Sequence, residues 1–151
     1  MKERIIEAIK ISRKDTFNLK LGEGGIREIE FFVQTLQLLF GGQIPSLQTP
    51  NTLEVLQRLF EVKLIKQEEF ETLTKAYLFL RTMEHRLQLV EEQQTHLLPS
   101  SPEELHQLSR RMGYFDKDIS AATKHMLEDL ENHREHVKEI FNDLLSHRFE
   151  E

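Results

Sequence analysis

The chain has 151 residues, the size of one domain, and 38% of them are hydrophobic, which is enough for a buried core. Charged residues make up 30% and Trp is absent, a composition typical of a soluble helical protein rather than a disordered one. A net charge of −6 without a long Lys/Arg cluster argues against nucleic acid as a partner, and the absence of Cys excludes disulfides and thiolate metal sites.

The first two expected helices cover residues 2–14 and 26–40. In the first, isoleucines recur among Lys, Arg and Glu at helical spacing. In the second, apolar residues recur every three or four positions, and the pattern stops at Gly41-Gly42 with Pro45 beyond. The apolar positions of this second helix are Ile26, Ile29, Phe32, Val33, Leu36, Leu39 and Phe40.

A short third helix and a long fourth helix follow. The third begins with Asn51 or Thr52 as its cap and runs to about residue 60. The fourth extends from about residue 66 to residue 95 without an internal Gly or Pro, so it should be the central helix of the fold. Its apolar positions are Phe70, Leu73, Tyr77, Leu80, Met83 (or Glu84) and Leu87.

The last two expected helices begin after Pro99. Ser101 supplies a cap hydroxyl, Pro102 the first helical position and Glu104 the third, which together predict a helix start. This helix ends at Gly113, and a final long helix runs from Ile119 to about residue 149. No strand pattern competes, so we expect a single domain over residues 1–151, an all-α antiparallel bundle of five to six helices.

No apolar stretch is as long as a membrane span, and the charged start MKERIIEAIK is unlike a signal peptide. We therefore expect a cytoplasmic protein with no membrane partner.

The stretch KLGEGGIREIEFF, residues 20–32, has two interpretations. Glycine allows close approach to an anion, and the amides of Gly24, Gly25 and Ile26 would open a helix, where they carry partial positive charge. Lys20 and Arg27 could add charged donors to phosphate oxygens. The first interpretation is thus a phosphate site.

The second interpretation is a glycine-rich helix start, which the pattern alone favours. The spacing matches no standard phosphate loop, no strand precedes it, and Glu23, Glu28 and Glu30 would oppose an anion. Glu28 would complement the helix dipole, and Arg27 would pair with Glu23 or Glu30.

A second polar group lies in FLRTMEHRLQLVEEQQTHLLP, residues 79–99. Arg81, Glu84, His85, Gln88 and Glu92 step by three and four, so they form one stripe along the fourth helix. Spacing alone favours an exposed stripe, and the alternative is a surface that faces another domain or a nucleotide.

Histidine spacing gives no converging metal site. A dimetal bundle needs two Glu-x-x-His pairs, and the chain has one, Glu103 and His106. The pairs His133/His136 and Glu92/His96 are explained by solvated helix faces, and we expect no metal ligands. No Ser lies in a nucleophile elbow, so hydrolase chemistry is not indicated.

Three stretches, KLGEGGIREIEFFVQTLQLLFGG, AYLFLRTMEHRLQ and QTHLLP, in this order resemble the helical domain of the glutamine synthetase adenylyltransferase/adenylyl-removing enzymes. The likeness covers nearly the whole chain and is nearer to the domain after the first nucleotidyltransferase domain. PII uridylyltransferase is a weaker likeness. Glu23 stands where the family often has Pro or a small residue.

The resemblance implies one component of a larger nucleotidyltransferase, since its catalytic Gly-Ser pair and metal-binding carboxylates are absent from this sequence. We therefore expect a fragment that is inactive alone, with no catalytic residue of its own. At the nucleotide/phosphate or domain junction, the resemblance places Lys20, Gly22, Gly24, Gly25, Arg27, Glu28 and Glu30. As supporting polar residues, it places Arg81, Glu84, His85, Arg86, Gln88, Gln94, Thr95 and His96.

For the full-length enzyme the resemblance implies AMP transfer from ATP to a tyrosine of glutamine synthetase, and its phosphorolytic removal. Mg²⁺ and ATP are implied there as cofactors, with none bound by this fragment. The expected partners are glutamine synthetase, the PII protein and an upstream nucleotidyltransferase domain, in the context of nitrogen regulation. The alternative is a non-catalytic helical module that docks glutamine synthetase, PII or a neighbouring domain.

Overall fold

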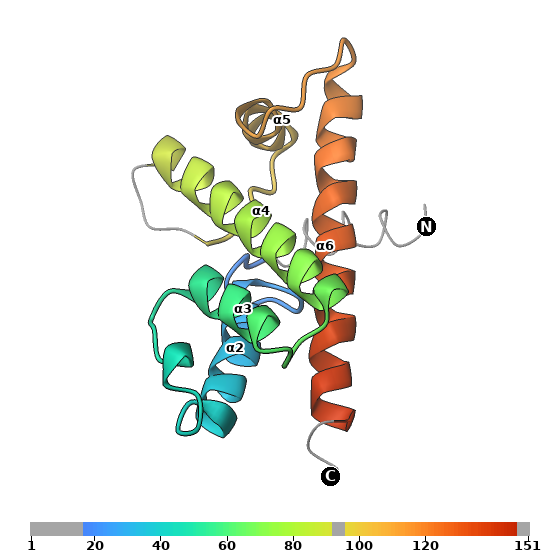
Figure 1. Ribbon diagram of the computed structural model, residues 1–151. Helices are drawn as coiled ribbons and strands as arrows, with labels where there is room; N and C mark the ends of the chain where they lie inside the picture. The colour runs from blue at the N-terminus through green and yellow to red at the C-terminus, as the bar shows by residue number, and fades with distance from the viewer. Residues whose placement is uncertain (1–16, 92–95, 148–151) are drawn as a thin grey trace.

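The computed structural model describes residues 17–91 and 96–147 (Figure 1). The expected helix 2–14 and residues 92–95, with Gln94 and Thr95, lie outside the described residues. Every named element of the described residues is a helix, which confirms the all-α fold class. Its elements are α2 (Ile26–Phe40), the 3-10 turn η1 (Pro45–Leu47), α3 (Thr52–Glu61), α4 (Gln67–Glu91), α5 (Pro102–Arg111) and α6 (Ile119–His147).

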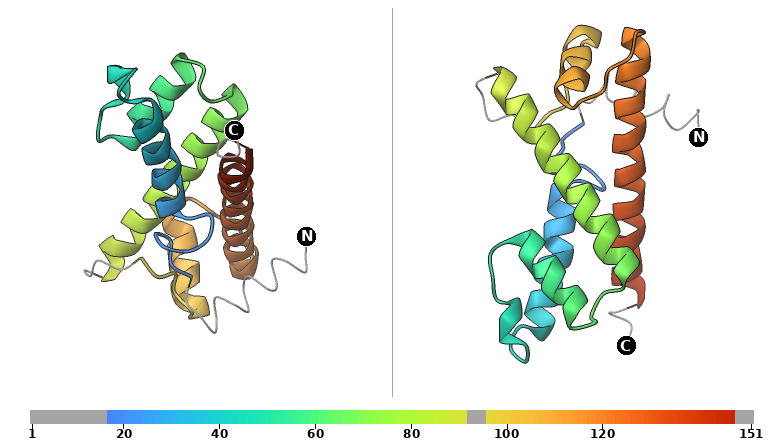
Figure 2. Two further views of the ribbon diagram at one scale, coloured as in Figure 1. Left: turned by 90° about the horizontal axis from the view of Figure 1, so that it is seen from below. Right: turned by 45° about the horizontal axis from the view of Figure 1, so that its top comes forward.

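Three helices surround the core, and two shorter ones extend it. α6 stands along one side, α4 crosses it diagonally, and α2 contacts both (Figures 1 and 2). α3 packs on α2 and α4, while α5 packs on α4 and α6 near the start of α6. The largest fully buried side chains are Phe32, Leu19, Ile26, Ile29, Leu36, Leu47, Leu56, Leu59, Leu73, Leu80, Met83 and Leu98.

The helix ends follow the capping residues. The side chain of Asn51 accepts the backbone N–H of Glu54 at 3.2 Å, and the Ser101 hydroxyl accepts that of Glu104 at 3.1 Å. Gly113 ends α5 with φ +93°, a left-handed conformation. Both expected starts and this expected stop are confirmed. None of the described helices is both long enough and apolar enough to cross a membrane.

Two expectations about individual side chains are wrong. Leu39, expected among the apolar positions of α2, is 50% exposed, because it lies at the edge of the buried face in the last turn of that helix. Glu84 belongs to the stripe expected to be exposed on α4, but it is only 6% exposed. The reason is tertiary: the segment after α4 returns and pairs with the chain before α2 through an isolated antiparallel bridge between Asn18 and Leu97.

Candidate functional site

The glycine-rich stretch forms a tight loop before α2. The side-chain oxygen of Asn18 accepts the backbone N–H groups of Lys20 and Leu21, both at 2.9 Å. The backbone carbonyl of Asn18 accepts the N–H of Gly22 at 2.8 Å. One short side chain thereby supplies the acceptor for two backbone N–H groups of the turn. We call residues 18–25 the glycine loop.

Three glycines are needed in this loop for different steric reasons. Gly24 has φ +71°, and a Cβ there would lie 2.3 Å from the carbonyl oxygen of Arg134 in α6. A Cβ on Gly22 would meet the Phe17 ring at 2.2 Å, and one on Gly25 would meet the Leu19 oxygen at 2.6 Å. At Gly24 the loop backbone therefore lies directly against the α6 backbone, and at Gly22 and Gly25 it lies close to residues 17–22.

α6 also holds the loop through two cations. The Arg134 guanidinium lies 3.7 Å from the Phe17 ring centroid, and its Nε donates to the Glu23 carbonyl at 2.9 Å. A further bond to Glu131, at 3.1 Å, fixes its orientation. Lys138 Nζ donates to the Glu23 carboxylate at 2.9 Å. Burial lowers the pKa of Arg134, and the nearby carboxylates of Glu131 and Glu23 oppose that shift.

The backbone N–H groups of residues 24–26 already donate hydrogen bonds within the chain. The N–H of Gly24 donates to the Glu28 carboxylate at 3.0 Å, and that of Gly25 donates to the Gly22 carbonyl at 3.0 Å. The N–H of Ile26 donates to the Leu19 carbonyl, also at 3.0 Å. The three amides that the sequence offered to a phosphate are therefore already hydrogen-bonded in this arrangement. Any anion contact here would have to come from side chains.

Two of the acidic residues that would oppose an anion, Glu23 and Glu28, have partners within the chain. Glu28 accepts the Gly24 amide at the start of α2, where the helix dipole favours a carboxylate. Glu23 pairs with Lys138, which overturns the expected pairing of Arg27 with Glu23. Glu30 is half-buried. Glu23 and Glu28 therefore both have partners within the chain.

The backbones of Lys20 and Arg27 are adjacent at the start of α2. The N–H of Arg27 donates to the Lys20 carbonyl at 2.9 Å. Arg27 is exposed and Lys20 half-buried. Neither side chain has an ion pair within residues 17–91 and 96–147. Two cations on adjacent backbone segments are suited to hold a multiply charged anion.

The second motif meets the first through a buried carboxylate. Glu84 on α4 accepts Arg81 at 2.9 Å with one oxygen, and its other oxygen lies 2.6 Å from His96 Nδ1. The His96 carbonyl accepts the Leu19 N–H at 2.7 Å. Glu84 and His96 therefore connect α4 to the glycine loop, so the three stretches that suggested a family lie in one place.

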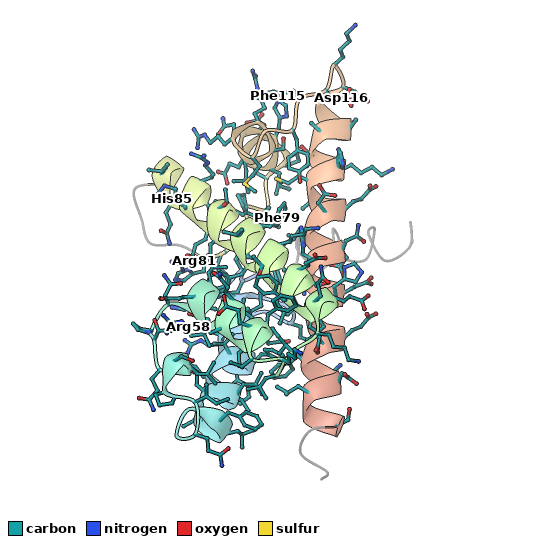
Figure 3. The ribbon with its side chains drawn as sticks, in the orientation of Figure 1. Arg58, Phe79, Arg81, His85, Phe115 and Asp116 are labelled. Carbon is teal, nitrogen blue, oxygen red and sulfur yellow. The ribbon has the colours of Figure 1, made fainter. Side chains whose placement is uncertain are left out.

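The remaining residues of the second motif have different positions. Figure 3 shows Arg81 and His85 on the side of α4 that faces away from α6, whereas Phe79 lies toward α6. Arg86 is also exposed, and Gln88 is half-buried. The motif is therefore divided, with Glu84 supporting the loop and the exposed residues facing outward.

The histidines considered as metal ligands lie in α5 (His106), in α6 (His133 and His136) and after α4 (His96). His133 packs on the Phe79 ring, with centroids 4.7 Å apart, and burial lowers the pKa of His133. In residues 17–91 and 96–147, no three His, Asp or Glu side chains converge in a way that could hold a metal ion.

Arg134 and Lys138 were not predicted as site residues. Both lie on the charged side of α6, where their spacing resembles that of any solvated helix face. Their contacts with Glu23 join residues more than 110 positions apart, and no local sequence pattern predicts such contacts.

The pair of Glu23 and Lys138 predicts a pH-dependent stability. The hydrogen bond and charge of Lys138 lower the pKa of Glu23 from 4.5, and Glu23 raises the pKa of Lys138 from 10.5. The stabilisation is therefore complete between these values and is lost as the pH falls through the lowered pKa of Glu23 or rises through the raised pKa of Lys138. Lys138→Ala should lower the unfolding midpoint slightly at pH 7, by an amount that shrinks as the pH is lowered stepwise below 4.5, measured by urea titration. Lys124→Ala, which removes an exposed α6 cation, is the control. A loss that stays constant over the whole acid range would contradict the pairing.

A comparison with known families decides the classification. The family model described as GlnD PII-uridylyltransferase matches residues 1–145 of the 151. The chain belongs to this family. Its expected likeness to PII uridylyltransferase is thereby confirmed.

Curated relatives in this family carry a different enzyme name. One from Neisseria meningitidis serogroup A is 45% identical over 129 residues, which are 85% of this chain and 14% of the relative. One from Xanthobacter autotrophicus is 44% identical over 127 residues, 84% of this chain and 13% of the relative. One from Agrobacterium fabrum is 50% identical over 99 residues, 66% of this chain and 10% of the relative.

All three relatives are named bifunctional glutamine synthetase adenylyltransferase/adenylyl-removing enzyme. The resemblance read from the three sequence stretches is therefore confirmed. The chain spans only 10 to 14% of the length of these relatives.

Proposed function

We propose that this chain is the helical domain of a glutamine synthetase adenylyltransferase/adenylyl-removing enzyme, and that it packs on and completes the nucleotidyltransferase domain. The observation that supports it is the joint position of Lys20 and Arg27, linked by the 2.9 Å bond between the Arg27 amide and the Lys20 carbonyl. The relatives are adenylyltransferases by name, and an adenylyl group contains a phosphate.

In this proposal the chain contributes binding and orientation. Arg27 presents a planar fork of donors and Lys20 a point charge to phosphate oxygens at the junction. Mg²⁺ held by carboxylates of the nucleotidyltransferase domain would neutralise charge on ATP or on the phosphate that removes AMP. The glycine loop positions the backbone of Lys20 and the start of α2 with Arg27, since α6 contacts the loop on one side and Glu84 with His96 on the other.

The test is phosphate-dependent ADP release from adenylylated glutamine synthetase, with the catalytic domain expressed separately. Adding this chain should restore turnover, and Arg27→Ala should reduce the restored rate about 10- to 100-fold, the loss expected for one charge-assisted contact. Because Arg27 is exposed, its replacement should leave the fold intact.

Arg110→Ala, which removes an exposed cation from α5, is the matched control and should change nothing. Turnover that is restored equally by wild type and Arg27→Ala would remove the phosphate contact from the proposal. Turnover indifferent to the whole chain would remove the completing role as well.

A second function is favoured by the outward side of α4. Exposed cations and two exposed leucines, Leu78 and Leu89, lie on that helix. The function that fits them is a non-catalytic module that docks glutamine synthetase, PII or a neighbouring domain. It predicts turnover that is independent of Lys20 and Arg27.

A further inference from the structure

One side of α4 combines apolar and basic residues in a regular pattern. Leu78, His85 and Leu89 follow one another by seven and four positions and so form one row on the helix, at about 100° per residue. Leu78 is 48% exposed and Leu89 is 61% exposed. We call this row and its flanking cations the α4 outer face: Lys75, Leu78, Arg81, His85, Arg86 and Leu89, all exposed.

The cations lie on both edges of the apolar row. Arg81 lies along one edge of the row, and Lys75 and Arg86 along the other. Residues 75–89, all of them described, contain one carboxylate, Glu84, and it is buried. The α4 outer face therefore shows only positive charge to solvent, although the whole chain carries a net charge of −6.

This pattern fits a particular type of partner. A helix that packs along α4 would bury Leu78 and Leu89 against its own apolar row and place residues of its edges beside Arg81 and Arg86. Those edge residues must be acidic, because like charges at this distance repel. We propose that the α4 outer face is a docking surface for an acidic amphipathic helix of a protein partner.

Two sources of such a helix within this chain fit less well. The apolar segment 2–14 carries five basic and two acidic residues, the same sign as the α4 outer face. α6 is rich in Glu, but its acidic residues are not flanked by a row of exposed leucines or isoleucines in the described part. Neither this segment nor α6 of a second copy therefore offers the acidic face with a row of leucines that the α4 outer face requires.

Docking at this face would also reach the glycine loop. Arg81 donates to Glu84, Glu84 contacts His96, and His96 accepts the Leu19 amide. A partner carboxylate that binds Arg81 competes with Glu84 for the same guanidinium. This inference deepens the second function above and rests on it.

The test uses a designed helical peptide of about 20 residues, long enough to form a helix, with one Leu row flanked by Glu. Fluorescence anisotropy of the labelled peptide measures binding to the whole chain. We expect binding that weakens at high salt, weakens about tenfold or more in Arg86→Glu, and is lost in Leu89→Glu. Both replaced side chains are exposed, and circular dichroism checks that the variants fold.

Two controls make the outcome specific. Lys124→Glu, the same charge reversal on α6, should bind the peptide like wild type, and a peptide with Lys in place of Glu should not bind. Equal binding of both peptides, or unchanged binding in Arg86→Glu, would overturn the proposal. Dimerisation of the chain that Leu89→Glu abolishes, seen by sedimentation, would assign the face to a second copy and also overturn it.

The outcome is separable from the phosphate role of the glycine loop. Lys20 and Arg27 are not part of the α4 outer face. The variants Lys20→Ala and Arg27→Ala should therefore leave peptide binding unchanged. Failure in the turnover assay with intact peptide binding would remove only the first function.

Discussion

Replacing Gly24 with alanine should destabilise the fold by about 2–5 kcal/mol, the combined cost of a left-handed non-glycine residue and an overpacked contact. Gly24 has φ +71°, and the added Cβ would lie 2.3 Å from the carbonyl oxygen and 2.7 Å from the Cα of Arg134. Both atoms belong to the α6 backbone, which cannot move away as a flexible side chain could. Urea unfolding, extrapolated linearly to water, measures the loss.

Two other glycines separate the contributions. Gly113 also has positive φ, +93°, but an added Cβ would meet nothing within 4 Å, so Gly113→Ala isolates the backbone strain. Gly42 has neither the positive φ nor a close neighbour, so Gly42→Ala should be nearly neutral. A Gly24→Ala loss no larger than that of Gly113→Ala would show that the loop does not lie against α6.

Replacing Glu84 with alanine should cost about 2–4 kcal/mol, since it removes two charge-assisted contacts of a buried group. Glu84 is 7% exposed at its side chain, whereas its partners Arg81 and His96 are 52% and 31% exposed. The partners can regain water, which keeps the loss below that of a fully buried pair. The Leu19 amide, bonded to the His96 carbonyl, should exchange faster with solvent deuterium in this variant.

The matched control for this prediction is Arg81→Ala. It removes only the half-exposed partner, so the loss should stay within about 1 kcal/mol. If Arg81→Ala destabilised the chain as much as Glu84→Ala, the link to His96 would not be the stabilising contact. Unchanged exchange at Leu19 would lead to the same conclusion.

The helices were predictable because their signals are local. Apolar spacing of three and four marks α2, α4 and α6, and capping residues such as Asn51, Ser101 and Gly113 fix helix ends within a few positions of the chain. The all-α fold follows from these signals alone.

The arrangement of the site was less predictable because its contacts are distant in sequence. Glu84 carries the spacing of an exposed stripe, and only the return of residues 96–98 buries it. The position of the glycine loop depends on Arg134 and Lys138, which pattern analysis cannot separate from ordinary surface charges. The stretches that carry the resemblance lie together in the structure, and the amides of the glycine loop already have partners within the chain.

The bridge between Asn18 and Leu97 gives the chain a nested topology. It closes a loop of about 80 residues, and such a closure costs entropy that grows only slowly with length. Inside the loop lie α2, α3 and α4, while α5 and α6 follow after the closure point. The bridge thus joins the two ends of this loop directly. α6 contacts the chain next to the bridge, where the Arg134 guanidinium lies over the Phe17 ring. The chain therefore closes this loop before α5 and α6 follow, and α6 then completes the core against α2 and α4.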